Sequence, residues 1–94
     1  MEGGTGIILR RGDATAGAIL VVALERGIAT AVLERSLGAD GYAVRPTGPA
    51  DPADGAALDA YLDRRRRSDP DLWIVELEGD GGLGERIARE VLGG

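Results

Sequence analysis

The sequence predicts a single α+β domain in which two helices pack on a mostly antiparallel sheet of four to five strands. Three observations lead to this class. Short apolar runs bounded by glycine, proline and aspartate recur before residue 46, and such runs are typical of strands. A capped helical pattern follows, and it leads into one more apolar strand. Because 94 residues suit one domain, we expect the order β-β-β-β-α-β-α within residues 1–94.

The first predicted strand covers residues 5–10 and the second covers residues 18–25. In the second strand, Leu20 and Val22 fall on one face and Ile19 and Val21 on the other. Apolar residues on both faces are typical of a central strand that is covered on both sides. Periodicity alone leaves a short buried helix open as an alternative for this segment.

Two more strands are predicted before the helix. The tight-turn signal Arg26-Gly27 indicates that residues 28–35 form a hairpin with the second strand. Residues 42–45 read as a short fourth strand, which ends at Pro46 because proline has no N–H to donate to a sheet. The segments between these elements and after them, residues 36–41 and 47–50, are predicted loops.

The first helix is predicted to begin at Asp51, which can serve as the N-cap, with Pro52 in the first helical position. Asp54 would lie in the first turn, near the positive end of the helix dipole. The helix should end at Asp69-Pro70, because the residue before a proline avoids the helical region. The stripe expected to face the sheet consists of Leu58, Tyr61, Leu62 and Arg65.

The remaining chain predicts a fifth strand over residues 72–78 and a second helix over residues 84–92. The only tryptophan, Trp73, lies near the start of that strand. Ion pairs at helical spacing are expected on both helices, between Asp63 and Arg67, Glu85 and Arg89, and Arg86 and Glu90.

The composition argues against several classes of function. The chain has no histidine and no cysteine, which removes the imidazole general base, the cysteine nucleophile and the thiolate zinc site. A net charge of -5 argues against nucleic-acid binding, which depends on attraction to phosphates. The sequence shows neither a signal peptide nor an apolar run long enough to span a membrane. We therefore expect a cytoplasmic protein that is not an enzyme and needs no cofactor.

Self-association or binding to another protein is the expected role, with a homodimer as the expected form. The chain has no phenylalanine and sixteen glycines, so its core must come from aliphatic side chains and its stability should be modest. Association would add buried area. The alternative is a small-ligand or phosphate binder that uses the arginine run at residues 64–67 or the glycine-rich turn at residues 79–84.

Both of those motifs have plainer interpretations. Residues 79–84 match the dinucleotide fingerprint and stand between a strand and a helix, but no further strand follows to complete the βαβ unit. The arginine run can be a solvated helix end that nearby aspartates neutralise. Four acidic residues could in principle hold a hard cation, although their spacing matches no known loop, namely Asp69, Asp71, Glu76 and Glu78.

Two segments resemble a small alphaproteobacterial family that is classed as domain of unknown function 1491. The first segment is LRRGDATAGA at residues 9–18. The second is YLDRRRR at residues 61–67, followed by DPDLWIVE at residues 69–76. The resemblance covers residues 7–78 and implies no known activity. It also implies a further apolar helix at the start, which this chain lacks, so that a sheet face would be exposed or buried in a partner.

The two segments also contain the candidate interaction residues. We expect Arg10 or Arg11 to pair with Asp69 or Asp71 and so to hold the helix–strand corner against the sheet. The complete candidate set is Arg10, Arg11, Arg64, Arg65, Asp69, Asp71 and Trp73.

Overall fold

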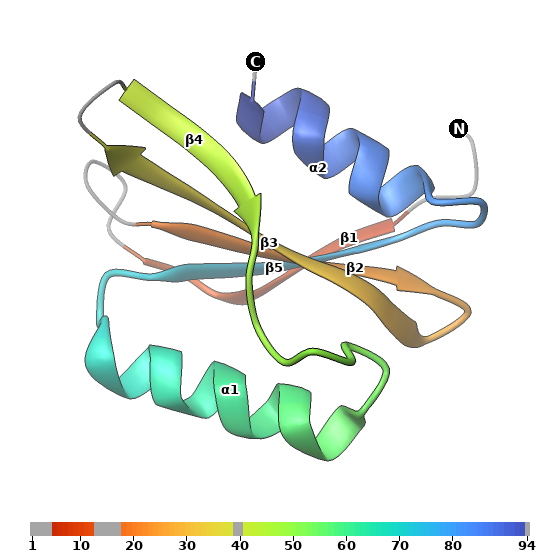
Figure 1. Ribbon diagram of the computed structural model, residues 1–94, viewed down its shortest axis with the longest axis horizontal. Coiled ribbons are helices and arrows are strands. Elements are labelled where there is room, and N and C mark those ends of the chain that lie inside the picture. Colours follow the sequence, from red (N-terminus) through yellow and green to blue (C-terminus); the bar gives the residue numbers. More distant parts are fainter. Residues whose placement is uncertain (1–4, 13–17, 39–40, 94) are drawn as a thin grey trace.

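The computed structural model describes residues 5–12, 18–38 and 41–93, and these form a five-stranded sheet with one helix on each face (Figure 1). This is the predicted α+β class with the predicted order of elements. The elements are β1 (Thr5–Arg10), β2 (Ile19–Glu25), β3 (Ile28–Gly38), β4 (Gly41–Pro46), α1 (Gly55–Ser68), β5 (Trp73–Glu78) and α2 (Leu83–Gly93).

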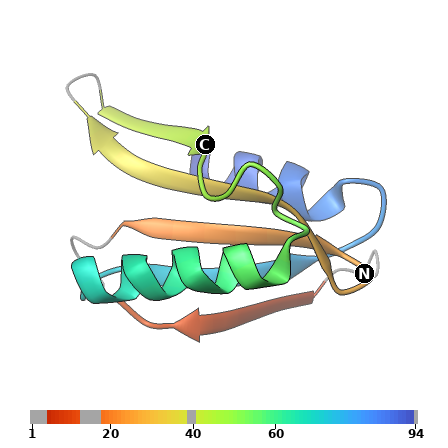
Figure 2. The same ribbon diagram turned by 60° about the horizontal axis from the view of Figure 1, so that its bottom comes forward.

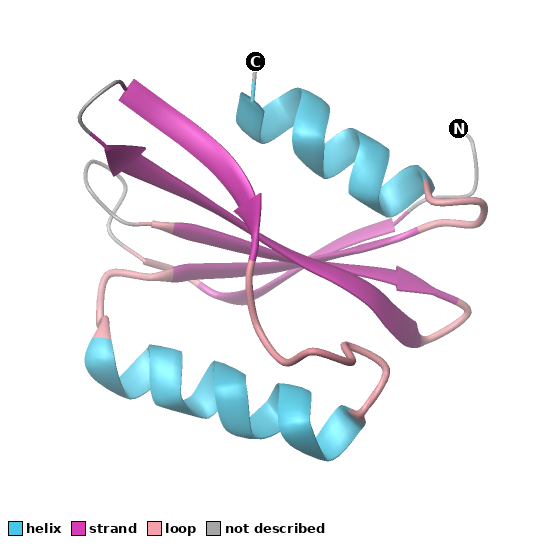
Figure 3. Ribbon diagram, viewed as in Figure 1, coloured by secondary structure: helices cyan, strands magenta, loops and turns pink. Residues whose placement is uncertain are grey.

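The strands lie in the order β1-β5-β2-β3-β4, which places β2 in the middle and leaves β1 and β4 as the two edges (Figure 3). Consecutive strands β2, β3 and β4 pair as antiparallel hairpins. Helix α1 then carries the chain back across one face, so that β5 enters parallel to β2 and antiparallel to β1. The sheet is therefore mostly antiparallel, as predicted.

Helix α1 covers one face of the sheet through Leu58 and Leu62, the two buried positions of its predicted stripe. These side chains pack on Leu20 and Val22 of β2 and on Ile74 of β5. Burial of a leucine side chain of this kind contributes about 1.5–3 kcal/mol to folding. The larger of the two cores therefore lies between α1 and the centre of the sheet.

Helix α2 covers the opposite face. Ala88 is buried against Val21 of β2 and Leu33 of β3, and Leu77 packs at the margin of this second cluster. Alternate residues of β2 thus face α1 and α2, which confirms the prediction of a central strand covered on both sides. The buried-helix alternative for this segment is wrong, because the segment is hydrogen-bonded to a strand on each side.

The start of α1 corrects the sequence prediction. Asp54 is the N-cap and accepts a hydrogen bond from the Ala57 N–H, whereas Asp51 was expected to fill that position. Asp51 instead accepts a hydrogen bond from the Ala53 N–H, which closes a separate turn before the helix. Aspartate caps turns and helices through the same carboxylate geometry, and this is why two successive candidates were ambiguous in the sequence.

Smaller corrections concern the helical ion pairs and β3. Asp63 pairs with Arg66 one residue earlier than expected, while the predicted pair between Glu85 and Arg89 is confirmed. The Arg86 guanidinium donates to the Gly81 carbonyl at the start of α2, and its predicted pair with Glu90 is not formed in the described part of the chain. Strand β3 continues to Gly38 and β4 begins at Gly41, so residues 36–38 and 41 of the predicted loop are strand, while residues 39 and 40 lie outside the described residues.

Candidate interaction surface

Arg65 fastens α1 to the sheet. Its two guanidinium nitrogens donate to the two carboxylate oxygens of Glu34 on β3, each over 2.9 Å. The first of these nitrogens also donates to the Tyr61 hydroxyl, which is 2.6 Å from the Thr47 hydroxyl. The exposed fractions of the Arg65 and Glu34 side chains are only 22% and 15%. The hydrogen bonds to Glu34 raise the pKa of Arg65 further above its ordinary value, although burial opposes this, so the guanidinium is always charged.

The arginine run does not form one cationic surface. Because successive residues of a helix point about 100° apart, the four side chains diverge. Arg65 faces the sheet, Arg66 turns back to Asp63 on its own helix, and the Arg64 guanidinium lies over the Tyr61 ring. Arg67 is exposed. Arg65 and Arg66 of the run therefore stabilise the fold through contacts with Glu34 and Asp63, and Arg64 and Arg67 are exposed.

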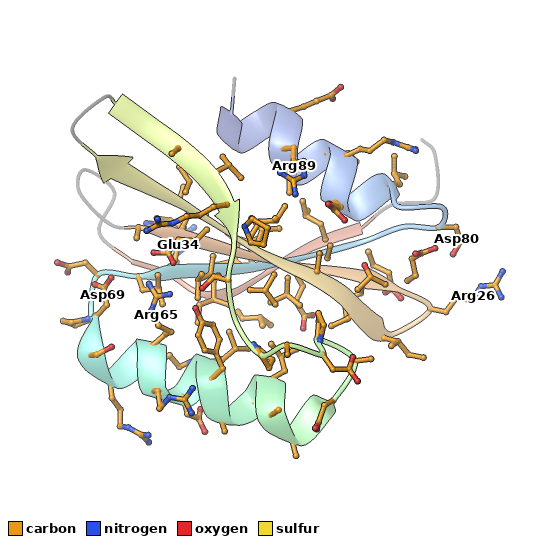
Figure 4. The ribbon with its side chains drawn as sticks, in the orientation of Figure 1. Arg26, Glu34, Arg65, Asp69, Asp80 and Arg89 are labelled. Carbon is orange, nitrogen blue, oxygen red and sulfur yellow. The ribbon has the colours of Figure 1, made fainter. Side chains whose placement is uncertain are left out.

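Local hydrogen bonds formed by Asp69 stabilise the corner between α1 and β5. Asp69 caps the helix, since its N–H donates to the Arg65 carbonyl, and its carboxylate accepts a hydrogen bond from the Asp71 N–H. Asp71 is exposed. Figure 4 shows Asp69 at the end of α1 beside this corner.

The expected ion pair between Arg11 and these acids is absent from the part of the chain that the structure describes. The Arg11 guanidinium instead lies over the Trp73 ring, 5.9 Å from its centroid. The side chain of Arg10 lies outside the described residues, so its predicted pairing stays untested. A cation over an indole ring contributes about 0.5–1 kcal/mol at an exposed site. Two of the candidate interaction residues, Arg11 and Trp73, are therefore in contact, but the contact is between a cation and an aromatic ring and is not an ion pair.

A close backbone approach joins β1 to this corner. A Cβ atom added at Gly12 would collide with the carbonyl of Asp71 and with the backbone of Leu72. Glycine is therefore required here by space, because any side chain would push the segment after β1 away from the start of β5. The segment after β1 therefore lies close against the backbone of this corner.

Two apolar residues of the edge strand β1 are exposed. Ile8 and Leu9 have exposed fractions of 50% and 40%, and the register between β1 and β5 shifts between Ile8 and Arg10, so that Leu9 lies within a β-bulge. Ile8 lies opposite Val75 on β5, and Trp73 follows two residues away on the same face. We call Ile8, Leu9, Arg11 and Trp73 the β1 surface. Figure 2 shows β1 at the margin of the sheet, beyond the strands that α1 covers.

Hydrogen bonds and an ion pair join the glycine-rich turn and the end of β5 to the β2–β3 hairpin. The Gly81 N–H donates to Glu25 over 2.7 Å, and the Gly27 N–H donates to Glu78 over 2.6 Å. The guanidinium of Arg26 lies 3.7 Å from the Asp80 carboxylate, an exposed pair at the end of the molecule opposite Arg65 (Figure 4). One amide that could hold a phosphate is thus occupied, and the carboxylates around it would repel an anion.

Packing accounts for another glycine of this motif. A Cβ at Gly84 would lie 2.6 Å from the Leu77 carbonyl oxygen, so glycine allows α2 to start close against β5. This is the role that the third glycine has in a dinucleotide fold. The motif therefore has a structural explanation.

The described residues hold no cluster of three or more carboxylates that could bind a metal ion. The four acidic residues considered from the sequence have separate surroundings, since Asp69 closes a turn and Glu78 holds the hairpin. None of the helices in the described part of the chain combines the length and the apolar character needed to cross a membrane.

Sequence reasoning missed the exposure of two apolar residues on β1 and the partly buried ion pair between Arg65 and Glu34. Ile8 and Leu9 were read only as part of a strand, because exposure depends on which strand lies at the edge of the sheet. Glu34 was not singled out, although it is the only acidic residue of β3 and follows the apolar run Ala31-Val32-Leu33, a signal that could have found it. Its partner on α1 lies 31 residues further along the chain.

Comparisons with known proteins identify the family. A family model described as "Protein of unknown function (DUF1491)" matches residues 1–84. The chain belongs to the DUF1491 family. A crystal structure of a DUF1491 family protein from Caulobacter crescentus CB15 is 36% identical, with a TM-score of 0.68, over 87% of this chain and 77% of that one. A search of curated proteins gave no match.

Two further solved structures support the assignment. An NMR structure of a DUF1491 family protein from Caulobacter crescentus CB15 is 37% identical with a TM-score of 0.67, over 86% of this chain and 74% of that one. The solution structure of protein Atu0922 from A. tumefaciens is 29% identical with a TM-score of 0.63, over 87% and 76%. The predicted resemblance is thus confirmed, and the DUF1491 match extends beyond residues 7–78 at both ends.

The DUF1491 resemblance also implied a sheet face that is exposed or buried in a partner. Both faces of β2 are covered within this chain, by α1 and α2. The open apolar area lies instead at one edge, on the β1 surface.

Proposed function

We propose that this DUF1491 protein is a non-enzymatic interaction module that binds a protein chain through the β1 surface. The observation that carries the proposal is the exposure of Ile8 and Leu9 on an edge strand, next to Trp73 with its arginine. Edge strands with apolar side chains are ready templates for another strand. Aromatic residues and arginines are also enriched where protein interfaces are strongest.

The polar groups elsewhere support an interaction role over catalysis or anion binding. Glu34, Glu25 and Glu78 each accept hydrogen bonds within the fold, and Arg65 and Arg66 donate theirs internally. Groups with such structural tasks are poorly placed to move protons or to hold a phosphate. No observation in the described residues favours the phosphate-binding alternative.

Site-specific photocrosslinking in the cells that make the protein tests this proposal. A benzophenone amino acid replaces Ile8 in the full chain, and in a matched control it replaces Ile28. Ile28 is an exposed isoleucine as well, at 57%, but it lies at the β2–β3 hairpin. We expect a discrete protein adduct from position 8 and not from position 28, identified by mass spectrometry.

A second comparison shows whether the adduct depends on the β1 surface. Replacing Arg11 by Glu should reduce the yield at position 8, because the cation over Trp73 would be lost. Equal labelling from positions 8 and 28, or no adduct at position 8, would contradict the proposal.

A further inference from the structure

The two helices, which lie on opposite faces of the sheet, are packed against it to different extents (Figure 1). Helix α1 buries Leu58 and Leu62. Of the α2 side chains that the structure describes, Ala88 is the one that is buried, and Leu83 and Ile87 are partly exposed. An alanine methyl group removes far less apolar surface from water than a leucine side chain does. The apolar contact that holds α2 is therefore the weaker of the two.

The polar contacts of the helices differ in the same direction. Helix α1 is joined to β3 by the ion pair of Arg65. On α2, Arg89 pairs with Glu85 of the same helix, and Arg86 donates to the Gly81 carbonyl in the turn before the helix. The contact of α1 would break if that helix left the sheet, whereas these contacts of α2 would survive.

The turn before α2 is itself joined to the β2–β3 hairpin. The Glu25 carboxylate accepts a hydrogen bond from the Gly81 N–H, and the Glu78 carboxylate accepts one from the Gly27 N–H. Hydrogen bonds to an ionised carboxylate are stronger than those between neutral groups. The chain is therefore held in place as far as the Gly81 N–H.

Two glycines separate this held segment from the helix. Gly81 and Gly82 have φ angles of +65° and +77°, which glycine adopts without strain. A Cβ atom added at either residue would meet nothing within 4 Å, so both lie in open space. Helix α2 begins immediately afterwards, at Leu83. Hinges are built from a few residues of this kind, which absorb a change in backbone angle while the attached element moves as a unit.

We propose that α2 is a hinged cover that swings away from the sheet about Gly81 and Gly82 while α1 and the sheet stay folded. The closed state buries Val21 and Leu33 beneath Ala88. The open state would uncover these two side chains, so α2 blocks an apolar face of the sheet until it moves. The carboxylate hydrogen bonds at the turn oppose the movement. This inference goes beyond the β1 surface and does not depend on it.

Thiol labelling of the full chain tests the inference, because the protein has no cysteine of its own. Ala88→Cys places a thiol beneath α2, and Ala29→Cys is the matched control in the core on the α1 side. Ala88 is 1% exposed and Ala29 is 7% exposed, so the closed structure alone predicts slower labelling at position 88. With an aromatic disulfide reagent we expect position 88 to react at least about tenfold faster, since local opening requires less free energy than global unfolding.

Amide hydrogen exchange on the unsubstituted chain gives a second measurement. Once α2 leaves the sheet, its 11 residues are too few for a stable isolated helix, so its amides exchange with solvent. The amides of residues 87–90 should therefore exchange at least about tenfold faster than those of residues 61–64 in α1, after correction for intrinsic rates.

Substitutions at the turn test what opposes the opening. Glu25→Gln plus Glu78→Gln, made in the Ala88→Cys chain, keep the shape of both side chains and remove their charge, which weakens the two hydrogen bonds. Labelling at position 88 should become several-fold faster. Glu76→Gln on the same strand as Glu78 is the control and should leave the rate unchanged.

Two results would overturn the hinged cover: labelling at position 88 that is no faster than at position 29, or α2 amides that exchange as slowly as those of α1. A labelling rate that the two glutamine substitutions leave unchanged would remove the role of the carboxylates. Photocrosslinking at position 8 decides the proposed function separately, because Ile8 lies on β1 and not beneath α2.

Discussion

Arg65 and Arg67 are two residues apart on α1, but their surroundings give them different contributions to the free energy of unfolding. Arg65 is mostly buried in a two-pronged contact with Glu34, and Arg67 is exposed at the end of α1. Removing one member of a buried pair leaves the other charge without compensation, which costs far more than losing a surface charge.

Arg65→Met should therefore lower the free energy of unfolding by about 2 kcal/mol, below the 3–5 kcal/mol of a fully buried pair because Arg65 and Glu34 keep some exposure. Arg67→Met should change it by less than about 0.5 kcal/mol. Urea denaturation measures both. The double variant Glu34→Leu plus Arg65→Met should recover part of the loss, and additivity of the two substitutions would contradict the pairing.

At Gly12, the addition of a single Cβ atom is expected to change the stability of the fold. Gly12→Ala should destabilise the fold by about 1–3 kcal/mol, because its Cβ would collide with the Asp71 carbonyl. The control is Gly55→Ala at the start of α1, where a Cβ meets nothing within 4 Å. That change should be neutral or stabilising by about 0.4–1 kcal/mol. Thermal melts of both variants provide the comparison, and a melt of Gly12→Ala that equals the wild type would rule out the close approach.

Helix α1 shows at the scale of an element how two similar signals are separated. Asp51 and Asp54 are both aspartates before an apolar helix, and only Asp54 accepts a hydrogen bond from the third residue after it. Asp54→Ala should cost about 1 kcal/mol of stability. Asp51→Ala should cost less than half as much, since it loses only a turn bond. Urea denaturation measures both changes. A larger loss of stability for Asp51→Ala than for Asp54→Ala would indicate that Asp51 is the N-cap, as the sequence pattern predicted.

At the scale of the whole molecule, the strand order predicts how stability is distributed. Central β2 is hydrogen-bonded on both sides and covered by both helices, whereas β1 and β4 each have one free side. Amide hydrogen exchange followed by NMR at low protein concentration should therefore be slowest in β2. It should be fastest in the outward amides of β1 and β4. A uniform rate across the sheet would contradict this distribution.

The sequence by itself determined the class and order of the elements, because periodicity, turns and caps are local properties. Apolar residues on both faces of residues 18–25 already favoured a strand with two covering layers. The stripe on α1 and the strand at Trp73 followed from spacing in the same way. These signals depend on neighbours a few residues apart, so no knowledge of distant contacts was needed.

Only the tertiary structure decided which strand lies at the edge and which charges meet. The insertion of β5 between β1 and β2 exposes Ile8 and places Arg11 over Trp73, across 62 residues of sequence. Arg65 likewise finds Glu34 only because α1 crosses β3. The physical reason is that strand order and helix placement depend on packing between residues that are far apart in the sequence. The candidate interaction surface consists of residues that only this packing brings together.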